Sequence, residues 1–158
     1  YLVAPGTGKF EKRGFEGVGV LIVANAAAPN ATAQGSGPAF SEAECDAVRD
    51  WVRQGGSLLL IADHAPYGRA EALAARFGVE MGKGFVLDRA NSEAGPTLLV
   101  FSRENGLLGD HSLLRGRDAS EEIKRVIAFT GQSLTVPPGA VRWSASSKAG
   151  RRKSSRWE

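Results

Sequence analysis

Two residues that can do chemistry, Asp63 and His64, stand at the end of an apolar run. The segment "SLLLIAD" (57–63) is apolar up to Asp63, which is typical of a strand buried in a parallel sheet. His64, one of only two histidines in the chain, comes next. Carboxylate and imidazole groups bind divalent metal ions, and imidazole also exchanges protons near neutral pH. The pair therefore predicts a ligand or metal site just beyond the end of this strand.

The other histidine, His111, lies in a segment rich in charged residues, "GDHSLLRGRD" (109–118). A neutral imidazole can ligate a metal through one nitrogen while a carboxylate fixes the other. We predict that Asp63, His64 and His111 hold a divalent ion. The histidines favour zinc, whereas a carboxylate-rich arrangement would favour calcium or manganese. Asp110 is the candidate general base or a further ligand.

Four other polar residues are candidates for contact with a substrate. Arg115 and Arg117 would orient an anionic or carbonyl oxygen, because a guanidinium group donates several hydrogen bonds in one plane. Asn25 ends an apolar run of its own, and Tyr67 lies in the turn "PYG" (66–68). In open parallel sheets ligands bind beyond the carboxyl ends of the strands, so we expect a binding site at that rim.

The same residues also have purely structural explanations. Asp63 fits a helix cap and His64 fits an exposed turn. Arg115 and Arg117 could do no more than form ion pairs with the glutamates at 121–122. The two histidines are 47 residues apart, a spacing that matches no metal-binding motif. Both explanations therefore stay open at this stage.

The chain has no candidate nucleophile at the end of a strand. Its single cysteine, Cys45, falls within a predicted helix, where we expect it to pack in the core, and no GxSxG motif occurs. Water activated by a metal ion is then the available nucleophile. We predict a small hydrolase acting on an ester, lactone or amide bond. The alternative is a non-catalytic domain that binds a ligand or another protein at the same rim.

Strands and helices in alternation are expected to position these residues. The β-branched run "GVGVLIVAN" (17–25) predicts a strand covered on both faces, followed by a long loop. A helix is predicted to start at Ser41, which can form a capping box with Glu44, and to end at Gly55.

A second helix, which follows the strand at 57–63, is expected to bury Leu73 and Phe77. The order strand, helix, strand, helix predicts right-handed crossovers and a parallel sheet. Further strands are predicted at 97–102 and within 123–134, with mostly loop at 103–122.

The basic charge of the chain is confined to its C-terminal end. The 158 residues carry a net charge of +3, but residues 142–158 alone carry +5 and the others −2. We therefore expect a single α/β domain at 1–141, a disordered basic tail at 142–158, a small-molecule substrate and no nucleic-acid partner. No apolar run reaches the ~20 residues of a membrane-spanning helix. We expect a cytoplasmic protein if the chain is complete, and a periplasmic or secreted one if a leader has been removed.

Two stretches of the chain resemble a known superfamily. The run "LIVAN" (21–25) followed by "FSEAECDAVRDWVRQGGSLLLIADHAP" (40–66) is similar to the ThuA-like and gliding-motility or intraflagellar-transport-type domains. These domains form a branch of the class I glutamine amidotransferase-like superfamily. The segment "HSLLRGRDASEEIKRVIAFTGQSL" (111–134) resembles a later segment of uncharacterised bacterial members. The similarity covers about residues 16–136.

This resemblance implies a flavodoxin-like three-layer sandwich with a mainly parallel sheet. It places Asp63 and His64 near the elbow that holds the catalytic cysteine of true amidotransferases. Because this chain has no cysteine there, we do not expect it to be a glutaminase. Members of the superfamily carry further strands before and after the matched region, so the sheet is expected to be incomplete at both ends. Exposed strand edges would then favour a homo-oligomer.

Overall fold

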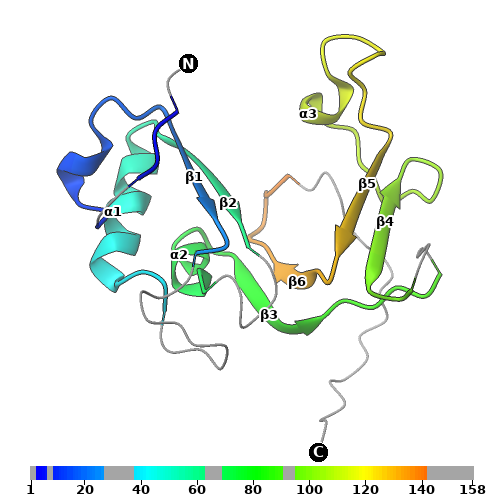
Figure 1. The fold of residues 1–158 in the computed structure, drawn as a ribbon, viewed down its shortest axis with the longest axis horizontal. Helices are drawn as coiled ribbons and strands as arrows, with labels where there is room; N and C mark the ends of the chain where they lie inside the picture. Colours follow the sequence, from blue (N-terminus) through cyan, green and yellow to red (C-terminus); the bar gives the residue numbers. More distant parts are fainter. Residues whose placement is uncertain (1–2, 7–8, 27–37, 63–68, 91–94, 142–158) are drawn as a thin grey trace, which may run out of the picture. The chain divides into compact units, whose positions relative to one another are not determined.

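The protein has a mixed α/β structure built from short elements (Figure 1). The computed structural model describes residues 3–6, 9–26, 38–62, 69–90 and 95–141. Their elements, in chain order, are a 3-10 helix η1 (Lys12–Phe15), β1 (Val20–Ala24), α1 (Glu42–Arg53), β2 (Ser57–Ile61), α2 (Glu71–Ala75), β3 (Glu80–Phe85), β4 (Leu98–Ser102), α3 (Ser112–Arg115), β5 (Arg125–Phe129) and β6 (Gln132–Thr135).

The strands pair two by two, as β1–β2, β3–β6 and β4–β5. The pair β1–β2 is parallel, which confirms the prediction for this part of the chain, and the pair β4–β5 is antiparallel. The described residues form two compact units, one within Tyr1–Met81 together with Leu134–Pro137 and the other within Gly82–Ser133 together with the residues from Pro138 onward. A single domain at 1–141 stays a prediction, and the predicted tail at 142–158 lies outside the described residues. In the part of the chain that is described, no helix has the length and apolarity to cross a membrane.

Helix α1 begins and ends where local signals place it. The side chain of Ser41 accepts a hydrogen bond from the Glu44 amide, and the Glu44 carboxylate accepts one from the Ser41 amide, so the predicted capping box is present. The helix ends before Gly55, whose φ of 104° lies in the region that favours glycine. The amide of Gly55 donates to the Val52 carbonyl and closes the last turn.

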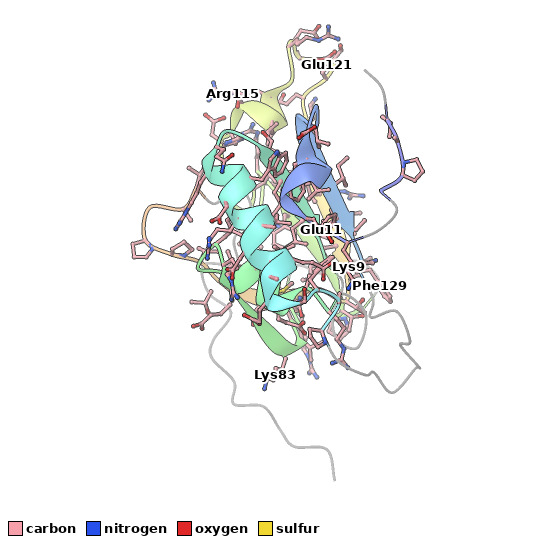
Figure 2. The ribbon with its side chains drawn as sticks, turned by 90° about the vertical axis from the view of Figure 1, so that its left-hand side faces the viewer. Lys9, Glu11, Lys83, Arg115, Glu121 and Phe129 are labelled. Carbon is pink, nitrogen blue, oxygen red and sulfur yellow. The ribbon has the colours of Figure 1, made fainter. Side chains whose placement is uncertain are left out.

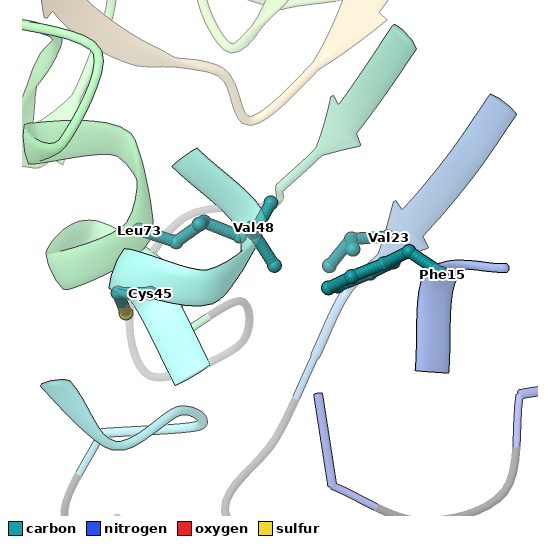
Figure 3. Close-up of a cluster of buried hydrophobic side chains, with 5 residues drawn as sticks. All are labelled: Phe15, Val23, Cys45, Val48 and Leu73. Carbon is teal, nitrogen blue, oxygen red and sulfur yellow. The ribbon is translucent and has the colours of Figure 1, made fainter. Parts of the chain in front are cut away.

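The core of the first unit forms where α1 and α2 pack against one side of β1 (Figure 3). Phe15, Val23, Cys45, Val48 and Leu73 are its buried side chains. Burial raises the pKa of the Cys45 thiol, so the thiol stays protonated at neutral pH. The prediction that Cys45 packs in the core is therefore confirmed.

The opposite face of β1 and β2 is apolar and exposed, so among the described residues the strand predicted to be covered on both faces is covered on one. Cα partners in the register are Ile22 with Leu59 and Ala24 with Ile61, and the side chains of such partners share a face. Ile22 is 59% exposed and Leu59 is 49% exposed. Burial alternates along each strand, because successive side chains point to opposite faces and the side chains of α1 and α2 pack against one of these faces.

An ion-pair network joins α1 to the chain just after α2. The Nε of Arg76 lies 2.8 Å from the Asp46 carboxylate, and its Nη2 pairs with Glu42. The hydrogen bond from Arg76 holds the pKa of Asp46 below its usual range. A carboxylate with a lowered pKa in the folded state stabilises the fold above its unfolded pKa, and this contribution is lost as the pH falls through the folded value.

We expect the free energy of unfolding of the Asp46→Asn variant to depend less on pH than that of the parent. The difference should develop as the pH falls below about 4, the ordinary pKa range of an aspartate. Urea unfolding at pH 6, 4 and 3 measures it. The Glu16→Gln variant, which also removes one negative charge, is the control and should keep the acid sensitivity of the parent. Equal acid sensitivity in Asp46→Asn and the parent would contradict this expectation.

Candidate functional site

Strands β1 and β2 end level with each other at one edge of the first unit. Ala24 and Ile61, the last residues of the two strands, are partners in the register. The pairing continues one residue further, because the Asn25 amide donates to the Ile61 carbonyl over 2.9 Å. Asn25 then turns the chain away from the sheet with a φ of 45°. The predicted position of Asn25 at the carboxyl edge of a parallel pair is thus correct.

The predicted residues Asp63, His64 and Tyr67 lie outside the described residues. Strand β2 ends at Ile61, and the described range that contains it ends at Ala62, the residue before Asp63. A metal site formed by Asp63, His64 and His111 therefore stays a prediction. Within the described ranges, no three histidine, cysteine, aspartate or glutamate side chains come together as a metal ion would require.

Arg69 lies at the same edge, and sequence reasoning did not single it out. Its amide donates to the Ala26 carbonyl over 2.9 Å, and its carbonyl accepts from the Ala39 amide over 3.0 Å. The side chain is half-buried, and its Nε is buried without a hydrogen-bond partner among the described residues. No motif marks Arg69; its only sequence signal is its position between "PYG" and the helix that follows.

His111 serves as the cap of helix α3 in the second unit. Its Nδ1 accepts a hydrogen bond from the Leu113 amide over 3.2 Å. A neutral imidazole that accepts at Nδ1 carries its proton on Nε2, so neither nitrogen keeps a free lone pair for a metal ion. Metal binding by His111 would therefore require this cap to break.

Asp110 is held by arginines. The Nε of Arg115 lies 2.8 Å from the Asp110 carboxylate, and a nitrogen of Arg103 lies 3.9 Å from it. Arg103 also pairs with Glu122 over 3.2 Å. The oxygens of a carboxylate paired in this way are already engaged, so the group is less available to a metal ion or a substrate than a free carboxylate.

Arg117 pairs with Glu121, which was the structural alternative for this residue. Its amide donates to the Glu121 carboxylate over 2.9 Å and its Nε over 3.0 Å. The hydrogen bonds from Arg117 lower the pKa of Glu121, and those from Ser120 lower the pKa of Asp118. Figure 2 shows Arg115 on α3 and Glu121 in the loop that follows.

The charged segment 109–122 is thus tied together by its own side chains. Its predicted site residues Asp110, His111 and Arg115 do lie side by side, but each of them has a partner within the segment or on the neighbouring Arg103. Arg117 pairs separately, with Glu121. In the described contacts, the charged groups of this segment bind one another, as they would in a loop whose side chains stabilise its own conformation.

A hollow of about 180 Å³ lies against α1, lined by Phe15, Ala47, Asp50, Trp51 and Gln54. Most small-molecule pockets have volumes of roughly 300–1,000 Å³. Its one charged lining residue, Asp50, is 2.8 Å from Arg49. The hollow lies toward the end of α1, where the chain enters β2, and not at the carboxyl ends of the strands. It is therefore a poor candidate for the site.

No protein-family model, curated protein or solved structure matches the chain. Its function therefore has to be inferred from its own residues and their geometry.

Proposed function

We propose that this protein is a small-molecule-binding domain whose ligand lies at the carboxyl edge of β1 and β2. The observation that carries the proposal is the parallel register, which brings Asn25 level with the residues that follow Ile61. In a parallel sheet, this edge is where loops are free to surround a ligand while helices cover the strands themselves. Asp63, His64 and Tyr67 follow β2 directly in the sequence and would complete the site.

Binding without catalysis fits the described side chains better than hydrolysis does. The buried Cys45 thiol is protonated and cannot act as a nucleophile. Asp110 and His111, the predicted base and ligand, already have partners in the second unit. The domain would then hold a ligand, or present it to another protein, and not transform it.

A titration of the ¹⁵N-labelled chain with neutral carbonyl and hydroxyl compounds tests this function. Acetamide, γ-butyrolactone and glycerol are suitable probes. We expect saturable shifts of the Asn25 and Ala62 amides with at least one of them, and at least tenfold weaker binding in Asn25→Ala. Gln54→Ala, at the exposed end of α1, is the control and should bind like the parent. Shifts that miss both amides, or that survive in Asn25→Ala, would refute the proposal.

Hydrolysis of an ester, lactone or amide is the second candidate. It is favoured by the position of Asp63 and His64, an acid and an imidazole, directly after β2 in the sequence. A divalent ion such as zinc, calcium or manganese would supply activated water. The described residues do not fit such a centre, because His111 and Asp110 are engaged elsewhere.

Metal content and turnover separate the two functions. If the protein only binds, the purified untagged chain should contain no stoichiometric metal and should not hydrolyse p-nitrophenyl acetate or γ-butyrolactone in a chelator-sensitive way. A bound ion together with turnover that disappears in both His64→Ala and His111→Ala would establish the hydrolase instead.

We also propose that the domain belongs to the class I glutamine amidotransferase-like superfamily, with a flavodoxin-like three-layer sandwich. The β1–α1–β2 arrangement supports this, as does the apolar second face of the pair, which a further helical layer would cover. A dissolved paramagnetic agent tests the idea by NMR. Weak relaxation of the Ile22 and Leu59 methyl groups is expected for a covered face, and strong relaxation would contradict it.

A further inference from the structure

The side chain of Arg69 contains the one buried nitrogen or oxygen atom that lacks a hydrogen-bond partner among the described side chains. Native proteins satisfy nearly all buried polar atoms, because an unpaired donor loses its bonds to water and gains nothing in return. The loss is greater for a charged guanidinium than for a neutral group. The unpaired Nε of Arg69 therefore needs an explanation.

The backbone holds Arg69 firmly at the proposed ligand site. One hydrogen bond joins it to Ala26, the residue after Asn25, and another joins it to Ala39, just before α1. These two bonds fix the Cα of Arg69 beside the carboxyl edge of β1. The backbone from which the side chain extends is therefore already in place before a ligand binds.

Five other arginines of the described residues form ion pairs. Arg49, Arg76, Arg103, Arg115 and Arg117 each have a carboxylate within ion-pair distance. Arg69 has no such carboxylate among the described residues, although it is more buried than Arg115 or Arg117. Arg49 and Arg76 are half-buried, as Arg69 is, and both are ion-paired, so Arg69 differs from them in having no carboxylate partner among the described residues.

We infer that Arg69 binds an oxyanion, a carboxylate or a phosphate, carried by the ligand of this site. The guanidinium group suits such an anion, because its N–H donors lie in a plane and can meet two oxygens at once. An oxyanion would satisfy the buried Nε and compensate the positive charge together. The inference rests on the proposed ligand site and makes it specific for an anionic small molecule.

Titration of the ¹⁵N-labelled full chain with sodium phosphate and with sodium acetate, at constant ionic strength, tests the inference. We expect a saturable shift of the Arg69 Nε–H resonance and of the Ala26 and Ala39 amides with one of the two anions. The arm that responds identifies the oxyanion as phosphate or as carboxylate. This titration uses the parent protein, so its result does not depend on whether a variant folds.

Variants then assign the effect to Arg69. Arg69→Gln should weaken anion binding at least tenfold, and Arg69→Lys should weaken it less, since a lysine keeps the charge but not the planar donors. Arg53→Gln, in the exposed last turn of α1, is the matched control and should bind like the parent. Unchanged binding in Arg69→Gln, or no saturable shift with either anion, would overturn the inference. If acetamide, γ-butyrolactone or glycerol still binds at Asn25 in that case, only the anion specificity fails; if none of them binds either, the site itself fails.

Discussion

Replacement of Leu73 by alanine should strongly destabilise the first unit. Leu73 is fully buried, and it packs from α2 into the cluster formed by Val48 of α1 and Val23 of β1 (Figure 3). Truncation of such a leucine removes apolar contacts and leaves a cavity, at a cost of about 2–5 kcal/mol. Because a whole domain is stable by only about 5–15 kcal/mol, the loss is a large part of the total.

Urea unfolding followed by far-ultraviolet circular dichroism measures the effect. Leu113→Ala removes the same atoms from a side chain of α3 that is 70% exposed, so it serves as the control and should change stability by less than about 0.5 kcal/mol. If Leu73→Ala and Leu113→Ala had similar midpoints, the α1–α2–β1 cluster would not be the core of this unit.

Replacement of Gly116 by alanine should disorder the loop that follows α3. Gly116 ends this helix with φ 64° and ψ −161°, a combination that is essentially restricted to glycine. A β-carbon at this position would also lie 2.9 Å from the carbonyl carbon of Glu121, which is too close. The backbone strain alone costs about 1–3 kcal/mol.

Hydrogen exchange at the Ile123 amide reports this loss, because that amide donates to the Leu114 carbonyl over 2.7 Å. We expect its exchange to accelerate roughly 5- to 150-fold in Gly116→Ala. Gly84→Ala is the control, since Gly84 has no positive φ and its β-carbon would meet nothing within 4 Å. An unchanged exchange rate would show that the loop tolerates a side chain at 116.

The loop variant also bears on function. Asp110, His111 and Arg115 owe their arrangement to α3 and its cap. If this cluster is structural, as its contacts indicate, Gly116→Ala should leave the binding of neutral probes at Asn25 unchanged. Lost binding in a variant that still folds would instead indicate that the second unit contributes to the site.

The features that the sequence alone determined are those set by neighbouring residues. The capping box of Ser41 and Glu44, the end of α1 at Gly55 and the burial of Leu73 all follow from patterns within a few residues of one another. The parallel pairing of β1 with β2 was also predictable, because a single helix connects the two strands.

Only the tertiary structure decided the rest. Strands β4 and β5 pair antiparallel across a long intervening segment, and no local pattern determines which strands meet. The sequence left open whether the charged residues around His111 have partners of their own, and the structure shows that the Leu113 amide donates to His111 Nδ1 and that Arg115 pairs with Asp110. No motif marks Arg69, because the burial of its Nε is a property of the folded chain and not of the neighbouring sequence.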